Sequence, residues 1–107
     1  MVTVPEKIME AIFEYISIIS NEIVIEKVFL FGSYAKGTYH RDSDIDIAVY
    51  SKEFSSETRV EDMTHLLNKT WGLGFDIQPF PFGEDDYEDP EGIVEEILRT
   101  GMELKFA

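Results

Sequence analysis

The sequence contains no cysteine among its 107 residues. Disulfide bonds and thiolate metal sites are therefore excluded, and a metal ion would need oxygen ligands or one of the two histidines, His40 and His65. No apolar run reaches the roughly 18 residues that a membrane-spanning helix needs. The N-terminal segment carries acidic residues and lacks the basic leader of a signal peptide. We therefore expect a cytoplasmic protein with no membrane partner.

Basic residues are scarce. Lys and Arg number 9 against 22 Asp and Glu, which gives a formal net charge of −13. Because binding to a long nucleic acid depends on basic side chains that release counterions from the phosphate backbone, we do not expect the chain to bind such a partner on its own. A small anionic ligand is compatible with this charge where metal ions neutralise the contact. A basic protein partner is compatible with it as well.

The chain length and its aromatic and branched residues predict one folded domain over residues 1–107. Apolar residues at helical spacing predict a first helix that Thr3 caps and that runs to about Asn21. Trp71 is expected in the core. The remaining expected elements are a strand over 26–31, a short helix over 33–36, a strand over 44–50, a helix over 55–70, a strand over 75–80, an acidic loop over 84–91, a helix over 92–100 and a strand over 102–106. This order predicts an α/β fold.

The pair Gly32-Ser33, at the end of a predicted strand, is the first half of a candidate site. Glycine has no side chain, so the backbone can approach a ligand closely at Gly32. Ser33 begins the predicted short helix, where free N–H groups favour a phosphate, and its hydroxyl can add another donor. The pair therefore predicts a phosphate-binding turn.

Asp44 and Asp46 form the second half of the candidate site. They lie two residues apart on a predicted strand and share one face, whereas Ile45 and Ile47 point toward the core. Carboxylate oxygens suit Mg²⁺, which also takes waters and substrate phosphates as ligands. The pattern therefore predicts a magnesium-binding pair aimed at the phosphate that Gly32 and its neighbour would hold.

The segment GSYAKGTYHRDSDIDIAVY resembles the signature of the minimal nucleotidyltransferases, in the DNA polymerase β-like superfamily. That signature is Gly-Ser, a spacer near ten residues, and then Asp-x-Asp before an apolar strand end. Gly32, Ser33, Asp44 and Asp46 match it. The resemblance is specific over residues 28–50 and looser elsewhere. It implies a polymerase β palm-like fold, a small mixed β-sheet with helices packed on one side.

The resemblance also implies roles for residues outside the signature. The family carries a third acidic residue on a later strand, and Asp76 is the best match on the strand expected over 75–80. Asp76 would complete a site for two Mg²⁺ ions and help to deprotonate the attacking hydroxyl. Lys36 stands where the family often has Arg. Lys36 and Arg41 are candidates for contacts with the triphosphate of ATP or another nucleoside triphosphate.

The activity implied by the resemblance is transfer of a nucleoside monophosphate, AMP from ATP in the first instance, to an acceptor hydroxyl. Minimal nucleotidyltransferases are often paired with a HEPN-domain ribonuclease toxin, act as its antitoxin and can transfer AMP to a toxin tyrosine. A strongly acidic antitoxin suits a basic partner. Two alternatives stay open. One is a non-catalytic module that masks its partner, and the other is an enzyme that modifies small molecules such as aminoglycosides.

Overall fold

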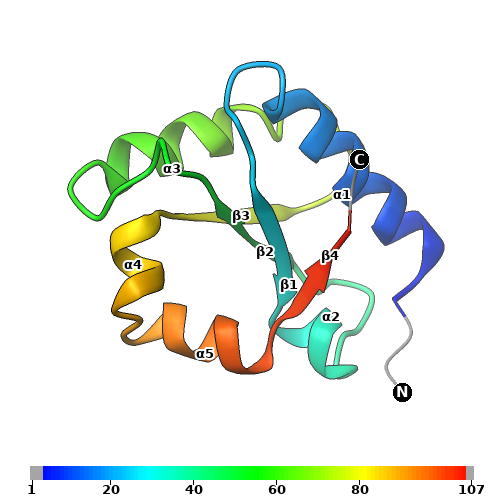
Figure 1. Ribbon diagram of the computed structural model, residues 1–107. Helices are drawn as coiled ribbons and strands as arrows, with labels where there is room; N and C mark the ends of the chain where they lie inside the picture. Colours follow the sequence, from blue (N-terminus) through cyan, green and yellow to red (C-terminus); the bar gives the residue numbers. More distant parts are fainter. Residues whose placement is uncertain (1–3, 106–107) are drawn as a thin grey trace.

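The computed structural model describes residues 4–105 (Figure 1). Thr3 and Phe106, the predicted helix cap and a residue of the predicted last strand, lie outside the described residues. Within residues 4–105, no helix is long and apolar enough to cross a membrane. The elements in chain order are α1 (Glu6–Ile19), β1 (Lys27–Phe31), α2 (Ser33–Lys36), β2 (Ile45–Tyr50), α3 (Arg59–Asn68), β3 (Ile77–Phe82), α4 (Glu84–Glu88), α5 (Ile93–Thr100) and β4 (Met102–Leu104).

The four strands form one mixed sheet in the order β3-β2-β1-β4. Strand β1 is antiparallel to both β2 and β4, whereas β2 is parallel to β3. Parallel neighbours need a long crossover connection, and here the chain crosses over through α3. The mixed sheet implied by the family resemblance is confirmed.

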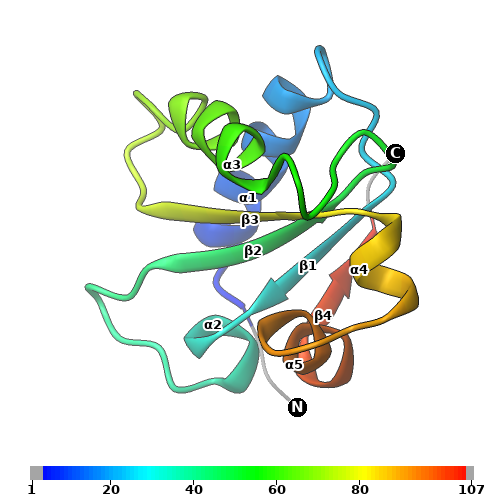
Figure 2. The ribbon, with the colours of Figure 1, turned by 90° about the vertical axis from the view of Figure 1, so that its left-hand side faces the viewer.

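Each face of the sheet carries its own core cluster. Ile45 and Ile47 of β2 point into the larger cluster, with residues of α1 and α3. Ala48 points the other way and packs with Val94 and Ile97 of α5. Figure 2 shows α3 above the sheet and α5 below it. The expectation of helices on one side only is therefore wrong, because the apolar residues of α5 cover part of the second face.

Strand β3 lies at the edge of the sheet and contains Pro79 and Pro81. The carbonyl groups of Asp76 and Phe82 accept backbone hydrogen bonds from the β2 segment, at 2.8 and 3.2 Å, so the even-numbered residues of β3 face β2. The two prolines therefore face the open edge, where a missing N–H removes no hydrogen bond from the sheet. For this reason the strand continues to Phe82, beyond the range 75–80 predicted from the sequence.

The acidic segment after β3 begins with a helix, which corrects the prediction of a loop over 84–91. The Asp86 carboxylate accepts a hydrogen bond from the Gly83 N–H at 3.1 Å, and the Tyr87 N–H donates to the Gly83 carbonyl at 3.1 Å. Carboxylates in the first turn of a helix interact favourably with its free N–H groups. The charges that suggested a solvated loop therefore stabilise the start of α4.

Arg59, the first residue of α3, connects that helix to β3 and α4. Its guanidinium donates to the Pro81 carbonyl at 2.8 Å and to the Asp86 carboxylate at 2.6 Å. It also lies over the Phe80 ring, 5.1 Å from the ring centroid. The side chains of Arg59 and Asp86 are only 26% and 12% exposed, so water screens this ion pair weakly.

We expect Arg59→Met to lower the free energy of unfolding by about 1–3 kcal/mol, because the carboxylate of Asp86 and the carbonyl of Pro81 lose their donor. The control is Lys36→Met, which removes a 3.4 Å ion pair with Glu96 in which both side chains are about half exposed. The free energy of unfolding of Lys36→Met should fall by less than about 0.5 kcal/mol. Urea denaturation of the three proteins measures both values, and equal losses would contradict the role given to Arg59.

Candidate active site

The candidate site lies at one end of the sheet, where β1 ends and β2 begins. Phe31, the last residue of β1, pairs with Asp46 of β2 in the antiparallel register. Gly32 follows directly and starts the turn into α2. The sheet register therefore brings the predicted phosphate-binding turn beside the predicted carboxylate pair.

Gly32 lies against the carboxylate of Asp46. A Cβ atom at position 32 would collide with Oδ2 of Asp46, so a larger residue would push that carboxylate away. Gly32 also has a φ of +73°, a backbone conformation that residues other than glycine rarely adopt. The backbone conformation therefore favours glycine at this position, and any larger residue would also displace the Asp46 carboxylate.

The start of α2 offers backbone donors next to Asp46. Ser33 begins this helix of four residues, which ends at Gly37 with a φ of 76°. The first N–H groups of a helix have no partner within the helix, so they are available to an anionic ligand. Because α2 is so short, these local N–H groups contribute more to anion binding than a helix dipole does.

Asp44 and Asp46 repel each other at the start of β2. Burial raises the pKa of Asp46 above its ordinary value, and the neighbouring charge of Asp44 raises it further. Asp46 is partly buried, whereas Asp44 is exposed. Two ionised carboxylates in such a place destabilise the fold, and a bound divalent cation would relieve that repulsion.

Asp76 lies next to this pair through the parallel register of β2 and β3. Ile45 of β2 pairs with Ile77 of β3. Asp44 and Asp76 directly precede these two residues, so they lie at the same end of neighbouring parallel strands. Asp76 is exposed and precedes β3, whereas the sequence predicted it within a strand. Over residues 4–105, no three acidic or histidine side chains form a group that could hold a metal ion. The role of Asp76 as a third ligand stays a prediction.

The two basic candidates lie in different surroundings. The Lys36 ammonium, at the end of α2, pairs with Glu96 of α5 at 3.4 Å. Arg41 is in the spacer and lines a cavity of about 210 Å³ together with Asp42 and Asp76. Of these two basic residues, Arg41 therefore shares a cavity with one of the candidate carboxylates.

Sequence reasoning missed a stacked pair of aromatic rings that holds the spacer. Tyr34 of α2 is buried, and its ring stacks on that of Tyr39 with a centroid distance of 4.6 Å. The His40 N–H then donates to the Ser43 hydroxyl at 2.8 Å, which closes a turn just before Asp44. Two tyrosines five residues apart in an otherwise polar spacer were the available signal.

Trp71 is 83% exposed, so the prediction that it packs in the core is wrong. Gly72 and Gly74 follow it, and both have a positive φ. The chain turns at these glycines toward β3, and the indole stays outside the core clusters described above.

Comparison with known proteins agrees with this geometry. The sequence profile of the nucleotidyltransferase domain family matches residues 11–104. The chain belongs to this family. The match includes the Gly-Ser turn, the spacer, Asp44 and Asp46, and it extends through β4.

Individual relatives are similar to this nucleotidyltransferase. A protein of Methanocaldococcus jannaschii, named as a candidate protein adenylyltransferase, is 32% identical over 73 residues, which cover 66% of this chain and 73% of that protein. The protein adenylyltransferase MntA of Shewanella oneidensis is 55% identical over 29 residues, 27% of this chain but only 21% of MntA. A crystal structure of a toxin–antitoxin with AMP-PNP has a TM-score of 0.59 at 24% identity, covering 96% of this chain and 75% of that chain. This last likeness shows a shared fold.

We expect Gly32→Ala to lower the free energy of unfolding of this nucleotidyltransferase by about 3 kcal/mol, since backbone strain adds to the collision with Asp46. The control is Gly74→Ala, at a φ of +78° with nothing within 4 Å of an added Cβ. It should cost about 1–2 kcal/mol, from the backbone alone. Thermal and urea unfolding compare the two variants. Equal losses would mean that the Asp46 carboxylate does not constrain position 32.

We expect Asp46→Asn to raise the melting temperature at neutral pH when no metal is present, because the ionised carboxylate destabilises the fold. Folding raises the pKa of this carboxyl group, so its charge lowers the stability of the fold at high pH. This loss of stability is absent below the pKa of the unfolded chain, ordinarily 3.8, and complete above the pKa of the folded chain. The gain should therefore vanish as the pH falls toward 3.8. Calorimetric scans with EDTA across this range measure it. A gain that is constant with pH would contradict the electrostatic cause.

Proposed function

We propose that this nucleotidyltransferase transfers AMP from ATP to a hydroxyl group of a partner protein and thereby acts as the antitoxin of that partner. The observation that carries the proposal is the close approach of Gly32 to the carboxylate of Asp46, which brings the predicted phosphate-binding turn beside a predicted metal ligand. The names of two relatives, both protein adenylyltransferases, support AMP as the transferred group. The toxin–antitoxin structure with the same fold supports the antitoxin role.

The donor set of the site fits magnesium. Asp44 and Asp46 offer oxygen ligands on one face of β2, and their mutual repulsion favours a divalent cation. Because Mg²⁺ takes one or two carboxylates together with waters and substrate phosphates, it does not need a cluster of three protein ligands. These two aspartates, joined by Asp76 for a second ion, would hold Mg²⁺, which would neutralise charge on the triphosphate.

The residues of the chain itself bind and orient the reactants. The N–H groups at Gly32 and Ser33, with the Ser33 hydroxyl, bind phosphate oxygens, and Arg41 adds positive charge. Lys36 adds charge only after it leaves Glu96. The acceptor oxygen forms a bond to the α-phosphorus, the bond from that phosphorus to pyrophosphate breaks, and the Asp76 carboxylate takes the hydroxyl proton. Catalysis is then mostly alignment and charge neutralisation.

The acceptor that we propose is a tyrosine of a basic, HEPN-type ribonuclease toxin. The net charge of −13 supports a basic partner, because opposite charges speed and orient association. The family resemblance of residues 28–50 supports the class of toxin. A module that only masks its partner would need neither the Gly32 turn nor ionised carboxylates beside it.

Calorimetry of ATP binding, with and without Mg²⁺, tests this proposal on the parent chain and on Asp46→Asn. We expect binding that requires Mg²⁺ and that weakens at least about tenfold in Asp46→Asn, the factor that 1.4 kcal/mol gives. The control is Glu14→Gln, the same change of charge on the exposed face of α1, which should keep its affinity. A folded parent chain that binds no ATP would overturn the proposal and favour the masking role.

A further inference from the structure

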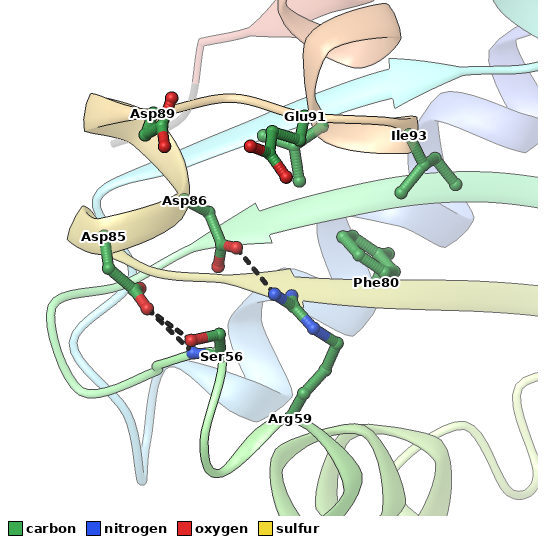
Figure 3. Close-up of a pocket in the computed structure, with 9 residues that line it drawn as sticks. Ser56, Arg59, Phe80, Asp85, Asp86, Asp89, Glu91 and Ile93 are labelled. Carbon is green, nitrogen blue, oxygen red and sulfur yellow. Dashed lines mark hydrogen bonds and ion pairs between the residues drawn. The ribbon is translucent and has the colours of Figure 1, made fainter.

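A cavity of about 590 Å³ opens beside the edge strand, between the start of α3, the end of β3 and the α4–α5 segment (Figure 3). We call it the edge groove and define it by four acidic and two apolar residues of its lining. They are Asp85, Asp86, Asp89, Glu91, Phe80 and Ile93. The groove is well over twice the volume of the 210 Å³ cavity beside Asp76.

Negative charge in the edge groove exceeds positive charge. Four carboxylates line it against one guanidinium, that of Arg59. Asp86 pairs with Arg59 at 2.6 Å, and Asp85 accepts hydrogen bonds from Ser56, which lower its pKa. Two further carboxylates, exposed on the segment that joins α4 to α5, have no ion pair within residues 4–105. These two carboxylates can therefore bind a cationic group of another molecule.

The two carboxylates without a partner are those of Asp89 and Glu91. Figure 3 shows Glu91 pointing into the open space between the α4–α5 segment and Arg59, with Phe80 and Ile93 beside that space. Ile93 is 45% exposed. A lysine or arginine side chain fits such a lining, because its apolar stem lies along hydrophobic surface while its charged end meets the carboxylates.

Two further apolar side chains are exposed near the start of α3 and beyond its end. Val60 follows Arg59 directly and is 76% exposed, and Trp71 beyond the end of the helix is 83% exposed. A metal ion or a polyamine would leave this surface in water, whereas a protein partner would bury it. Exposed tryptophan is also a residue type that contributes strongly to protein interfaces. These observations favour a protein as the occupant.

The edge of β3 does not favour the addition of a partner strand. Pro79 and Pro81 face the open edge and have no N–H to donate, and Arg59 already occupies the Pro81 carbonyl at 2.8 Å. Strand addition depends on such main-chain hydrogen bonds. A partner must therefore bind here through side chains.

The edge groove and Asp46 open on the same face of the sheet. Gln78 pairs with Asp46 in the parallel register, and Phe80 follows Gln78 by two residues. Alternate residues of a strand share a face and advance roughly 7 Å along it. A partner segment held in the groove therefore lies on the face of the sheet that carries Asp46.

We propose that the edge groove binds a lysine or arginine side chain of the partner protein and so holds the hydroxyl-bearing segment at the active site. The inference rests on the proposed function in one respect, which is that the bound protein is the one that carries the acceptor hydroxyl. The charge, shape and exposed apolar surface of the groove involve neither nucleotide nor metal, so binding can be tested without them.

The test is an NMR titration of the isotope-labelled full chain, without nucleotide or metal, with a short peptide that repeats Arg-Leu-Gly. We expect the amide signals of Phe80, Glu91 and Ile93 to shift. The double variant Asp89→Asn/Glu91→Gln should bind the peptide about tenfold more weakly, since it removes both carboxylates without a partner. The matched control, Glu10→Gln/Glu14→Gln on the exposed face of α1, should bind within about twofold of the parent, because α1 packs on the other face of the sheet from the groove.

Three outcomes would overturn the inference. If the two double variants lost peptide affinity equally, the peptide would be attracted only by the net charge of the chain. Equal binding of a peptide with Glu in place of Arg would remove the argument from charge. Displacement of the peptide by spermidine at the same affinity would identify a polyamine site. Failure of the proposed function would appear separately, as absence of Mg²⁺-dependent ATP binding, and would leave this titration interpretable.

Discussion

The packing of the Asp46 carboxylate against Gly32 is the contact on which the site depends. It follows from the pairing of Phe31 with Asp46, which joins the end of β1 to the start of β2. That register cannot slip by one residue without turning Ile45 and its apolar neighbours out of the core. Hydrophobic burial on one face therefore holds Asp44 and Asp46 together on the other, despite their repulsion.

The face that carries these carboxylates combines a core with a site. Beyond Asp46, Ala48 is buried and packs with Phe82 and two residues of α5. Asp46 remains partly exposed and Asp44, directly before the strand, is exposed, so a ligand can reach both carboxylates. A buried strand thus anchors the two candidate carboxylates at its start, which would hold their geometry without a large domain.

Charge explains how a strongly acidic chain can act on an anionic substrate. Five of the nine basic residues already form ion pairs within the chain, namely Lys36, Lys52, Arg59, Lys69 and Lys105, so few are available to a triphosphate. Metal ions and a basic partner would then supply the positive charge that the chain lacks. In our proposals the carboxylates at the start of β2 would meet the metal ions, and those of the edge groove would meet the basic partner.

The sequence by itself determined the elements with clear periodicity and the two halves of the site. Helix α1, strands β1 and β2 and the short helix after Gly32 follow from local patterns, since apolar alternation and glycine act over a few residues. The order of elements and the motif spacing also indicated the family before any contact was known. The helix predicted over 55–70 proved shorter, because helix ends depend on weak local preferences.

Only the tertiary structure decided the features that depend on residues distant in the chain. Strand β3 tolerates Pro79 because its backbone faces an open edge, and α4 is held by the contact of Asp86 with Arg59, 27 positions earlier. The exposure of Trp71 and the position of Asp76 outside its predicted strand are further examples. Local sequence patterns cannot encode these outcomes, because the fold must first bring the distant segments together before packing and hydrogen bonding can select among them.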